Sequence, residues 1–351
     1  MTPPSRCAPT PTCRPCWCGA DATISTEHPE YLACSSCSTA CYAGASPKLT
    51  ASSEDPEGFL YGESYWREHM SDLGYPDIHA RARTDLTERC QYWLSVLLKH
   101  RLPPGGIMEL GCAHGGFLKL ASAAGFDVLG IEMSPQIAQI GPRVFGVDVL
   151  QGPLETIPLG HRVFEAICLF DVLEHLPDPI QTISLAVQAL RDGGLLVIQT
   201  PEYEPGRGAA WTHFKAPEHL FLFSRASLDT FLKRLGLVHI DRIPSVFQGD
   251  QMVVASASPL ATHAAETVAA TLMASPEGRM VLAQQDIYRE LSHCMATRVA
   301  EPNLSAVPLR LLLRAFLSRS LSRLCHRGFS EPARAFLRRL RSTPSGSGTR
   351  S

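Results

Sequence analysis

The stretch IMELGCAHGGF, residues 107–117, places an acidic residue and several small residues directly behind a short apolar run. The apolar run is typical of a buried strand, and Gly111, Ala113 and Gly115 favour a sharp turn after it. Small residues at such a turn also let a ligand approach the main chain without meeting a Cβ atom. Glu109 disfavours a phosphate here and favours a ligand with an amine or another positive centre.

Two further segments carry residues suited to a nucleoside. The apolar segment 126–132 ends in Glu132, whose carboxylate can accept hydrogen bonds from both hydroxyls of a ribose. In GPLETIPL, residues 152–159, backbone amides near Leu154 are placed to read an adenine edge. Together with the first turn, these positions predict a site for a nucleoside that carries an aminoacyl tail and no phosphates.

Three side chains are suited to proton transfer. Glu174 and His175 follow the fourth apolar segment, and His219 lies in WTHFKAPEHLF, residues 211–221. A histidine can act as a general base near neutral pH. Either histidine can equally cap a helix or hold a loop, and the sequence ranks neither above the other.

A regular alternation of elements must position these residues. We expect strands at 107–110, 126–132, 147–152, 164–170 and 195–200, with helices at 62–101, 115–125, 134–144, 178–193 and 224–237. Such alternation predicts right-handed crossovers and a parallel sheet covered on both faces, with ligands at the carboxyl ends of its strands. VHIDRI and QMVVASA predict two more strands that pair antiparallel at the sheet edge, which makes seven.

The motifs ELGCAHGGF, GPLETIPL, FDVLEHLPDP and LRDGGLLVIQTP, in this order, resemble the class I S-adenosylmethionine-dependent methyltransferases. The group most similar is the small-molecule type, which includes the ubiquinone O-methyltransferases, and APEHLFLFSRASLDTFLKRLGL is similar to its late segment. The resemblance covers about residues 60–257. It implies an α/β, Rossmann-like methyltransferase domain at 59–257 with S-adenosylmethionine as its cofactor.

The resemblance also assigns roles to individual positions. The cofactor-binding residues that it implies are Glu109, Gly111, Ala113, Gly115, Glu132, Met133, Leu154 and Phe170. Met133 would pack on the adenine, although a core role explains it equally well. Ala113 replaces the usual middle glycine. Pro153 stands where an acidic residue often meets the adenine amino group, a role that Glu155 could take.

The resemblance implies methyl transfer to a small-molecule, sugar or glycan acceptor, with O-methylation ahead of C- and N-methylation. In ubiquinone-type relatives the acidic and histidine positions can hold a divalent ion, which we do not favour here. FDVLEH replaces the N/D-P-P-Y/F motif of amino-methylating nucleic-acid enzymes and disfavours that class. The alternatives are an RNA or protein methyltransferase and a non-catalytic scaffold. Tyr65 and Trp66 are interpreted as a lid or as simple packing.

Seven of the twelve cysteines lie within the first 41 residues. Clustering at one end of a long chain favours a metal site in a reducing compartment over a disulfide scaffold. CRPCWCG at 13–19 and CSSC at 34–37 are pairs of the kind that enclose a tetrahedral Zn²⁺. Residues 1–45 are therefore predicted to form a zinc-ribbon-like segment, with a disordered Cys-rich leader as the alternative.

The predicted ligands are Cys34 and Cys37 with two of Cys13, Cys16 and Cys18. Cys16 and Cys18 precede a glycine that suits a knuckle turn, although their spacing is one residue short, and Cys13 with Cys16 has the better spacing. We take Cys16 and Cys18 as the second pair. Some sugar C-methyltransferases resemble this layout, and there the zinc is structural and shapes the acceptor side. RNA binding is the competing use.

The net charge of the chain is −2, but its C-terminal part is strongly basic. From residue 308 to 351 there are ten arginines and one glutamate, and LRLLLRAFLSRSLSRL at 309–324 has the spacing of an amphipathic helix. We expect residues 259–351 to be a helical basic extension with a disordered end. Its helix packs as a terminal helix, docks on a partner, contacts nucleic acid or lies on an anionic membrane surface. The sequence shows no signal peptide and no run of about 18 apolar residues, so we expect a cytoplasmic protein, or one peripheral to a membrane.

Overall fold

The structure, a computed structural model, describes residues 14–48, 61–62 and 77–300. The chain divides into two units, residues 1–288 and 289–351. The described part of the second unit, 289–300, is helical. Predictions for Cys13, Tyr65, Trp66 and the basic helix at 309–324 lie outside the described residues. In the part of the chain that the structure describes, no helix is long and apolar enough to cross a bilayer.

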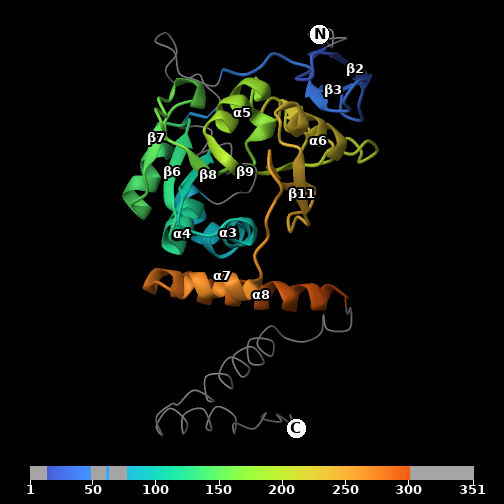
Figure 1. The fold of residues 1–351 in the computed structure, drawn as a ribbon. Helices are drawn as coiled ribbons and strands as arrows, with labels where there is room; N and C mark the ends of the chain where they lie inside the picture. The colour runs from blue at the N-terminus through green and yellow to red at the C-terminus, as the bar shows by residue number, and fades with distance from the viewer. Residues whose placement is uncertain (1–13, 49–60, 63–76, 301–351) are drawn as a thin grey trace, which may run out of the picture. The chain divides into compact units, whose positions relative to one another are not determined.

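A seven-stranded, mostly parallel sheet forms the centre of the first unit (Figure 1). Its strands are β5 (Gly106–Leu110), β6 (Asp127–Glu132), β7 (Val149–Gln151), β8 (Phe164–Phe170), β9 (Leu190–Pro201), β11 (His239–Ile243) and β12 (Asp250–Ser256). The order across the sheet is β7-β6-β5-β8-β9-β12-β11, and only β12 runs antiparallel to its neighbours. The predicted Rossmann-like α/β fold with an antiparallel edge is confirmed.

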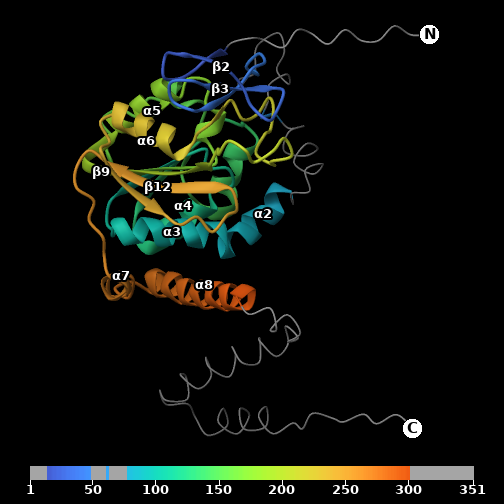
Figure 2. The same cartoon turned by 90° about the vertical axis from the view of Figure 1, so that its right-hand side faces the viewer.

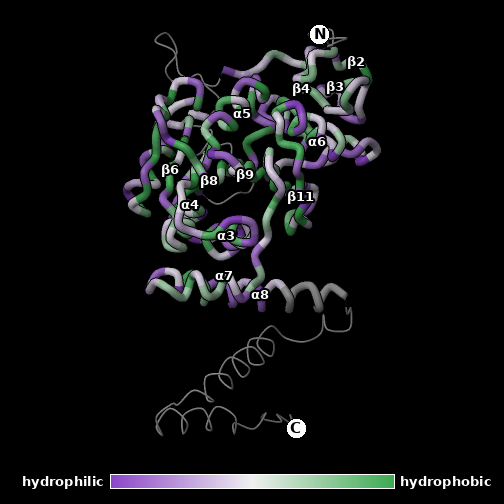
Figure 3. Tube along the Cα trace, in the orientation of Figure 1, coloured by the Kyte–Doolittle hydropathy of each residue, from purple (hydrophilic) through white to green (hydrophobic). Residues whose placement is uncertain are grey.

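Helices cover both faces of this sheet, as Figure 2 shows. The helices that cover the two faces are α3 (Arg89–His100), α4 (Gly116–Ala124), α5 (Pro179–Gln188) and α6 (Arg225–Arg234). The described residues also form α2 (Ile78–Thr84), α7 (Ala265–Leu272) and α8 (Pro276–Ala300). Successive strand residues point to opposite faces and belong to two apolar clusters. Ile107 is in the cluster that includes α3 and α4, and Met108 is in the cluster that includes α5 and α6. Because both faces are buried, β6 and β8 are mainly hydrophobic along their length (Figure 3).

Short turns of helix replace some of the predicted long ones. They are η2 (Asp85–Thr87), η3 (Ile137–Gln139), the π-turn η4 (Gly141–Phe145), η5 (Leu154–Thr156) and η6 (Leu173–His175). The predicted helix at 134–144 is thus wrong as a regular helix, because Pro142 lacks the N–H that an α-helix needs. The predicted helix at 178–193 ends at Gln188, and residues 190–194 already belong to β9.

The Cys-rich segment forms a second, small antiparallel sheet that the sequence did not predict. Its strands are β1 (Arg14–Pro15), β2 (Asp21–Ser25), β3 (Tyr31–Cys34), β4 (Ala40–Tyr42) and β10 (Phe221–Leu222), in that order. The last strand comes from the segment that follows β9, so Phe221 pairs with Cys41 across 180 residues of chain. The small sheet is therefore built into the larger domain by a shared strand.

Candidate active site

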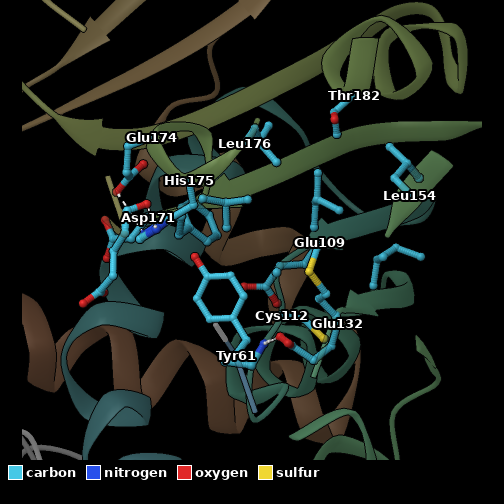
Figure 4. A pocket seen from close by; sticks show the side chains of 18 of the residues that line it. Tyr61, Glu109, Cys112, Glu132, Leu154, Asp171, Glu174, His175, Leu176 and Thr182 are labelled. Carbon is cyan, nitrogen blue, oxygen red and sulfur yellow. Dashed lines mark hydrogen bonds and ion pairs between the residues drawn. The ribbon is translucent and has the colours of Figure 1, made fainter. Parts of the chain in front are cut away.

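A cavity of about 820 Å³ lies at the carboxyl ends of the parallel strands (Figure 4). All the predicted cofactor-binding and catalytic residues except Gly115 line it. Residues from β5, β6 and the turn after β5 form one end. The segment after β8 and the segment 213–219 form the other. The structure thus brings together positions that lie more than 100 residues apart in the sequence.

The turn after β5 has a left-handed backbone at Gly111, Ala113 and Gly115, with φ of 71°, 45° and 78°. A Cβ atom on Gly111 would lie 2.4 Å from Cγ2 of Val172, so the two chain segments can approach only because this residue is glycine. Gly115 begins α4 and lies outside the cavity lining. A Cβ atom there would lie 3.0 Å from Cγ2 of Val147, so this glycine allows the start of α4 to pack against the segment that precedes β7.

Two buried glutamates, Glu109 and Glu132, lie at this end of the cavity. Glu132 Oε2 accepts a hydrogen bond from Ala113 N and Oε1 accepts one from Ser134 N, each at 2.9 Å. Glu109 Oε2 is buried and has no hydrogen-bond partner among the described residues. Burial, and then the nearby charge of Glu132, raise the pKa of Glu109 well above the ordinary carboxyl range. A cationic group would relieve this cost by pairing with Glu109.

The same end of the cavity offers apolar walls. Met133 and Leu154 line it, with Leu154 only 3% exposed. Phe170 stacks face to face on Trp93, with ring centroids 4.1 Å apart and an interplanar angle of 3°. Glu155 also lines the cavity, but its Oε1 accepts a hydrogen bond from the Thr182 hydroxyl. That bond leaves its other oxygen for the adenine role that the sequence suggested.

The predicted catalytic residues meet at the opposite end. The rings of His175 and His219 lie 4.7 Å apart, edge to face. Nδ1 of His175 lies 3.0 Å from Glu218 O, and Nδ1 of His219 lies 2.8 Å from His213 O. Because a carbonyl oxygen only accepts, each Nδ1 carries the proton and each Nε2 keeps its lone pair.

Glu174 completes this cluster. Its side chain is 1% exposed, Oε2 accepts a hydrogen bond from Thr200 Oγ1 at 2.9 Å, and Oε1 lies 3.9 Å from His175 Nε2. Burial, followed by the charge of Asp171, raises the pKa of Glu174. Burial lowers the pKa of both histidines, so both imidazoles are neutral at neutral pH. Ligand atoms of Glu174, His175 and His219 lie within 4.8 Å of one another, so the cluster can hold a shared proton or an ion.

Sequence reasoning missed a polar network beside this cluster. Arg89 NH1 donates to Asp171 Oδ2 at 2.7 Å, and Gln199 Nε2 donates to Asp171 Oδ1 at 2.9 Å and to Asp250 Oδ2 at 3.2 Å. Gln199 Oε1 accepts a hydrogen bond from Trp93 Nε1 at 2.8 Å. No sequence motif links these positions. Only the burial of Trp93 could be expected, from the apolar periodicity of α3.

The four predicted zinc ligands also come together, in the small sheet. Sγ of Cys16 lies 3.5 Å from that of Cys37, and Sγ of Cys18 lies 3.6 Å from that of Cys34. All four sulfurs lie within 4.8 Å of one another. Tetrahedral zinc with Zn–S bonds of 2.3 Å requires sulfurs about 3.8 Å apart, so the spacing fits this ion.

Each cysteine pair ends in the tight turn of a zinc knuckle. Gly19 N donates to Cys16 O at 3.0 Å, and Ser38 N donates to Cys34 O at 2.9 Å. The residues after the second cysteine of each pair have positive φ, 92° at Gly19 and 62° at Ser38. The two turns therefore match in form although one pair is a residue shorter.

Comparison with known proteins agrees with this geometry. Residues 81–241 match the family described as "Methyltransferase domain". This part of the chain is similar to a methyltransferase domain. It contains the turn after β5, the strand-end Glu132 and the Glu174–His175–His219 cluster, whereas the four clustered cysteines precede it.

The methyltransferase domain has named relatives in bacteria. A probable S-adenosylmethionine-dependent methyltransferase of Mycolicibacterium smegmatis is 29% identical over 156 residues, which is 43% of this chain and 59% of that protein. A ubiquinone biosynthesis O-methyltransferase of Cereibacter sphaeroides is 24% identical over 156 residues, 40% of this chain and 63% of the other. A tRNA U34 carboxymethyltransferase of Desulfotalea psychrophila is 26% identical over 148 residues, which is 38% of this chain and 46% of that protein. The matches thus span about half the length of these relatives.

Proposed function

We propose that this chain transfers a methyl group from S-adenosylmethionine to a hydroxyl of a small-molecule, sugar or glycan acceptor. One observation carries the proposal: a single cavity joins an end with a buried, unpartnered glutamate oxygen to an end with two neutral histidines. The match to the methyltransferase domain family and the names of the relatives support the reaction class.

The first end fits S-adenosylmethionine. Glu109 Oε2 would accept from the ammonium group of the methionyl part, and Gly111 and Ala113 of the turn after β5 line the cavity beside it. Glu132 keeps lone pairs for the ribose hydroxyls after accepting one backbone hydrogen bond at each oxygen. Met133 and Leu154 would flank the adenine. The donor supplies a methyl group that is already activated on a sulfonium.

The second end fits the removal of a proton from the acceptor. We assign the base to His175, because its side chain is 17% exposed, whereas His219 is only 3% exposed. The ring of His219 packs edge to face against that of His175 and would hold it in place. The lone pair on His175 Nε2 can take the hydroxyl proton, and Glu174 Oε1 at 3.9 Å then faces the imidazolium that forms. Holding the acceptor oxygen in line with the methyl group supplies much of the rate increase.

We also propose that Cys16, Cys18, Cys34 and Cys37 bind one structural zinc ion. The support is the close group of four sulfurs and the paired knuckle turns. A structural site of four thiolates has no open position, so it would act by holding the small sheet together.

Two measurements on the purified full chain test the main proposal. Calorimetry should show binding of S-adenosylhomocysteine, and Glu109→Gln should weaken it. Incubation with methyl-labelled S-adenosylmethionine and host extract should label sugars, glycans or small molecules, and His175→Gln should lower the rate without changing donor affinity. Label in RNA or protein would favour that alternative acceptor class, and donor binding without any transfer would favour a scaffold.

A further inference from the structure

The ring of His114 joins the turn after β5 to the segment that precedes α3. Its side chain is 6% exposed and lines the cavity. Gly116 N donates a hydrogen bond to His114 Nδ1 at 3.0 Å, and His114 Nε2 lies 3.2 Å from Asp85 Oδ2. Because a backbone N–H only donates, Nδ1 is the nitrogen without a proton, so Nε2 carries the proton and donates to Asp85. This tautomer is the reverse of the one at His175 and His219.

The glycine at position 116 makes room for this ring. A Cβ atom on Gly116 would lie 2.7 Å from Cε1 and 2.9 Å from Nδ1 of His114. Gly116 is not among the residues with positive φ, so its backbone does not require glycine. The second of the two adjacent glycines therefore supplies space for the His114 ring, which the sequence analysis did not explain.

Asp85 receives His114 as an ionised partner. The same oxygen, Oδ2, also accepts from Nε of Arg81 at 3.3 Å, and the two side chains of this ion pair are 18% and 14% exposed. Burial by itself would raise the pKa of Asp85, but the hydrogen bond from His114 and the charge of Arg81 lower it overall. The bond from His114 is thus charge-assisted and stronger than a bond between neutral groups.

The segment 77–88, which contains α2 and η2, forms a wall at the donor end of the cavity. Four of its residues line the cavity: Arg81, Thr84, Asp85 and Glu88. Ile78 of α2 packs in one apolar cluster with Ile137 and Ile140, which follow β6 in the chain. Ala113 of the turn packs against this cluster. The wall therefore contacts the turn after β5 and the segment after β6, the two parts that hold the donor-binding positions.

The turn transmits the position of the wall to the assigned donor residues. Ala113, the residue before His114, donates through its N to Glu132 Oε2 at 2.9 Å. One residue of the turn thus contacts the carboxylate assigned to the ribose, and the next contacts the wall. Displacement of Asp85 would shift the turn relative to Glu132.

We propose that His114 is a positioning residue for the donor: its two ring nitrogens hold the turn after β5 and the 77–88 wall together, so that the wall stays packed over bound S-adenosylmethionine. This inference rests on the proposed methyltransferase function and adds a residue to its donor site. His114 would act through the turn and the wall, and it would take no part in proton transfer.

The test breaks the His114–Asp85 bond from each side in the full chain. His114→Asn keeps a side-chain oxygen that can accept from Gly116 N but is too short to reach Asp85. Asp85→Ala removes the other partner, whereas Asp85→Asn keeps an acceptor for His114. His79→Asn, the same substitution at an exposed position of α2 outside the cavity lining, is the matched control.

Three quantities are measured for each variant: affinity for S-adenosylhomocysteine by calorimetry, Tm, and amide hydrogen exchange of residues 77–88. Exchange is measured without S-adenosylhomocysteine and at a concentration that saturates the variant. The double variant of His114→Asn and Asp85→Ala completes a cycle that shows whether the two substitutions break one shared contact.

We expect His114→Asn and Asp85→Ala to bind S-adenosylhomocysteine about tenfold or more weakly, as loss of one charge-assisted hydrogen bond predicts, and Asp85→Asn to lose less. The double variant should bind no more weakly than either single variant. Ligand should slow exchange of residues 77–88 in the unmodified protein and in His79→Asn, and it should slow it less in His114→Asn at saturation.

Unchanged affinity in His114→Asn and Asp85→Ala would overturn the inference, and a lower Tm with unchanged affinity would assign the bond to folding alone. Additive losses in the double variant would show that the two side chains do not act through one contact. Equal losses in Asp85→Asn and Asp85→Ala would assign the effect to the charge beside Arg81. Failure of the unmodified protein to bind S-adenosylhomocysteine would instead overturn the proposed function on which the inference rests.

Discussion

The hydroxyl of Tyr31 donates a hydrogen bond to the backbone oxygen of His219 at 2.9 Å. Tyr31 belongs to β3 of the small sheet and is 1% exposed, so this bond joins the Cys-rich segment directly to the end of the cavity where His175 and His219 lie. Tyr42 N also donates to Leu220 O at 2.9 Å. The small sheet thus holds the segment that carries His219 through both side-chain and backbone contacts.

Replacing Tyr31 by Phe should slow methyl transfer without changing donor binding. The variant leaves a buried carbonyl oxygen without its donor, which costs about 1–3 kcal/mol of stability. We expect a lower rate of methyl transfer and unchanged affinity for S-adenosylhomocysteine, because Glu109 and Glu132 lie at the other end of the cavity. Tyr42→Phe, on the adjacent strand, is the matched control. Equal effects of the two variants would show that the bond to His219 has no special role.

Removing the metal should act through the same contacts. Metal analysis of the purified chain should find about one zinc ion, and Cys34→Ser with Cys37→Ser should lose it, lower Tm and slow methyl transfer. Cys90→Ala, a buried cysteine outside the cluster, should retain the zinc. Zinc retained in full by the double variant would rule out the proposed ligand set.

Glu109 should make donor binding depend on pH. Its raised pKa means that the carboxyl is neutral over a wider range than usual and ionises only as pH rises. Since an ammonium group pairs with the ionised form, affinity for S-adenosylhomocysteine should increase with pH above the ordinary carboxyl range near 4.3. Glu109→Gln should bind about tenfold or more weakly, with a flatter pH profile. Glu266→Gln, exposed on α7, should behave as the unmodified protein.

The buried histidines should make the fold sensitive to mild acid. Burial lowers the pKa of His219 below that of the unfolded chain, about 6.5, so the unfolded state takes up a proton first. This contribution to stability is complete above pH 6.5 and declines as pH falls from there through the folded pKa. Urea unfolding at pH 7.5, 6.5 and 5.5 should show that decline, and His219→Gln should reduce it. A parallel decline in both proteins would assign the effect to other groups.

Gly111 and Gly146 allow steric and conformational effects to be separated. Both have positive φ, 71° and 65°, but a Cβ atom on Gly111 would meet Val172 at 2.4 Å and one on Gly146 would meet nothing within 4 Å. Gly146→Ala should cost only about 1–2 kcal/mol of backbone strain. Gly111→Ala should cost more and should also weaken donor binding, and Val172→Ala in the same chain should recover part of the stability. Thermal and donor-binding measurements would decide this.

The sequence predicted the large sheet well because its strands are short apolar runs bounded by glycine and separated by helices. The site at the carboxyl edge followed from Glu109, the small residues after it and Glu132, since these lie close together in the chain. Asp171, Arg89 and Asp250 were missed because they meet only through strand order. Asp250 in particular depends on β12 entering the sheet between β9 and β11, a choice that no local pattern records.

The small sheet was missed for a related reason. Its strands have two to five residues, too few for a periodic pattern, and β10 has two residues within a segment for which the sequence predicted neither helix nor strand. Pairing of Phe221 with Cys41 depends on contacts between distant parts of the chain. The cysteine spacing still predicted which four cysteines come together, because short spacing between candidate ligands can be read directly from sequence.

The strand shared at β10 has a consequence for how such a protein can change. Under the proposed function, a different acceptor would require changes in the segment after β9, yet two residues of that segment also form the last strand of the Cys-rich sheet. Substitutions there must satisfy two partners at once. A chimaera that takes its first 48 residues from a relative should therefore fold stably only when residues 211–223 come from the same relative. The two stretches would then have to change together during evolution.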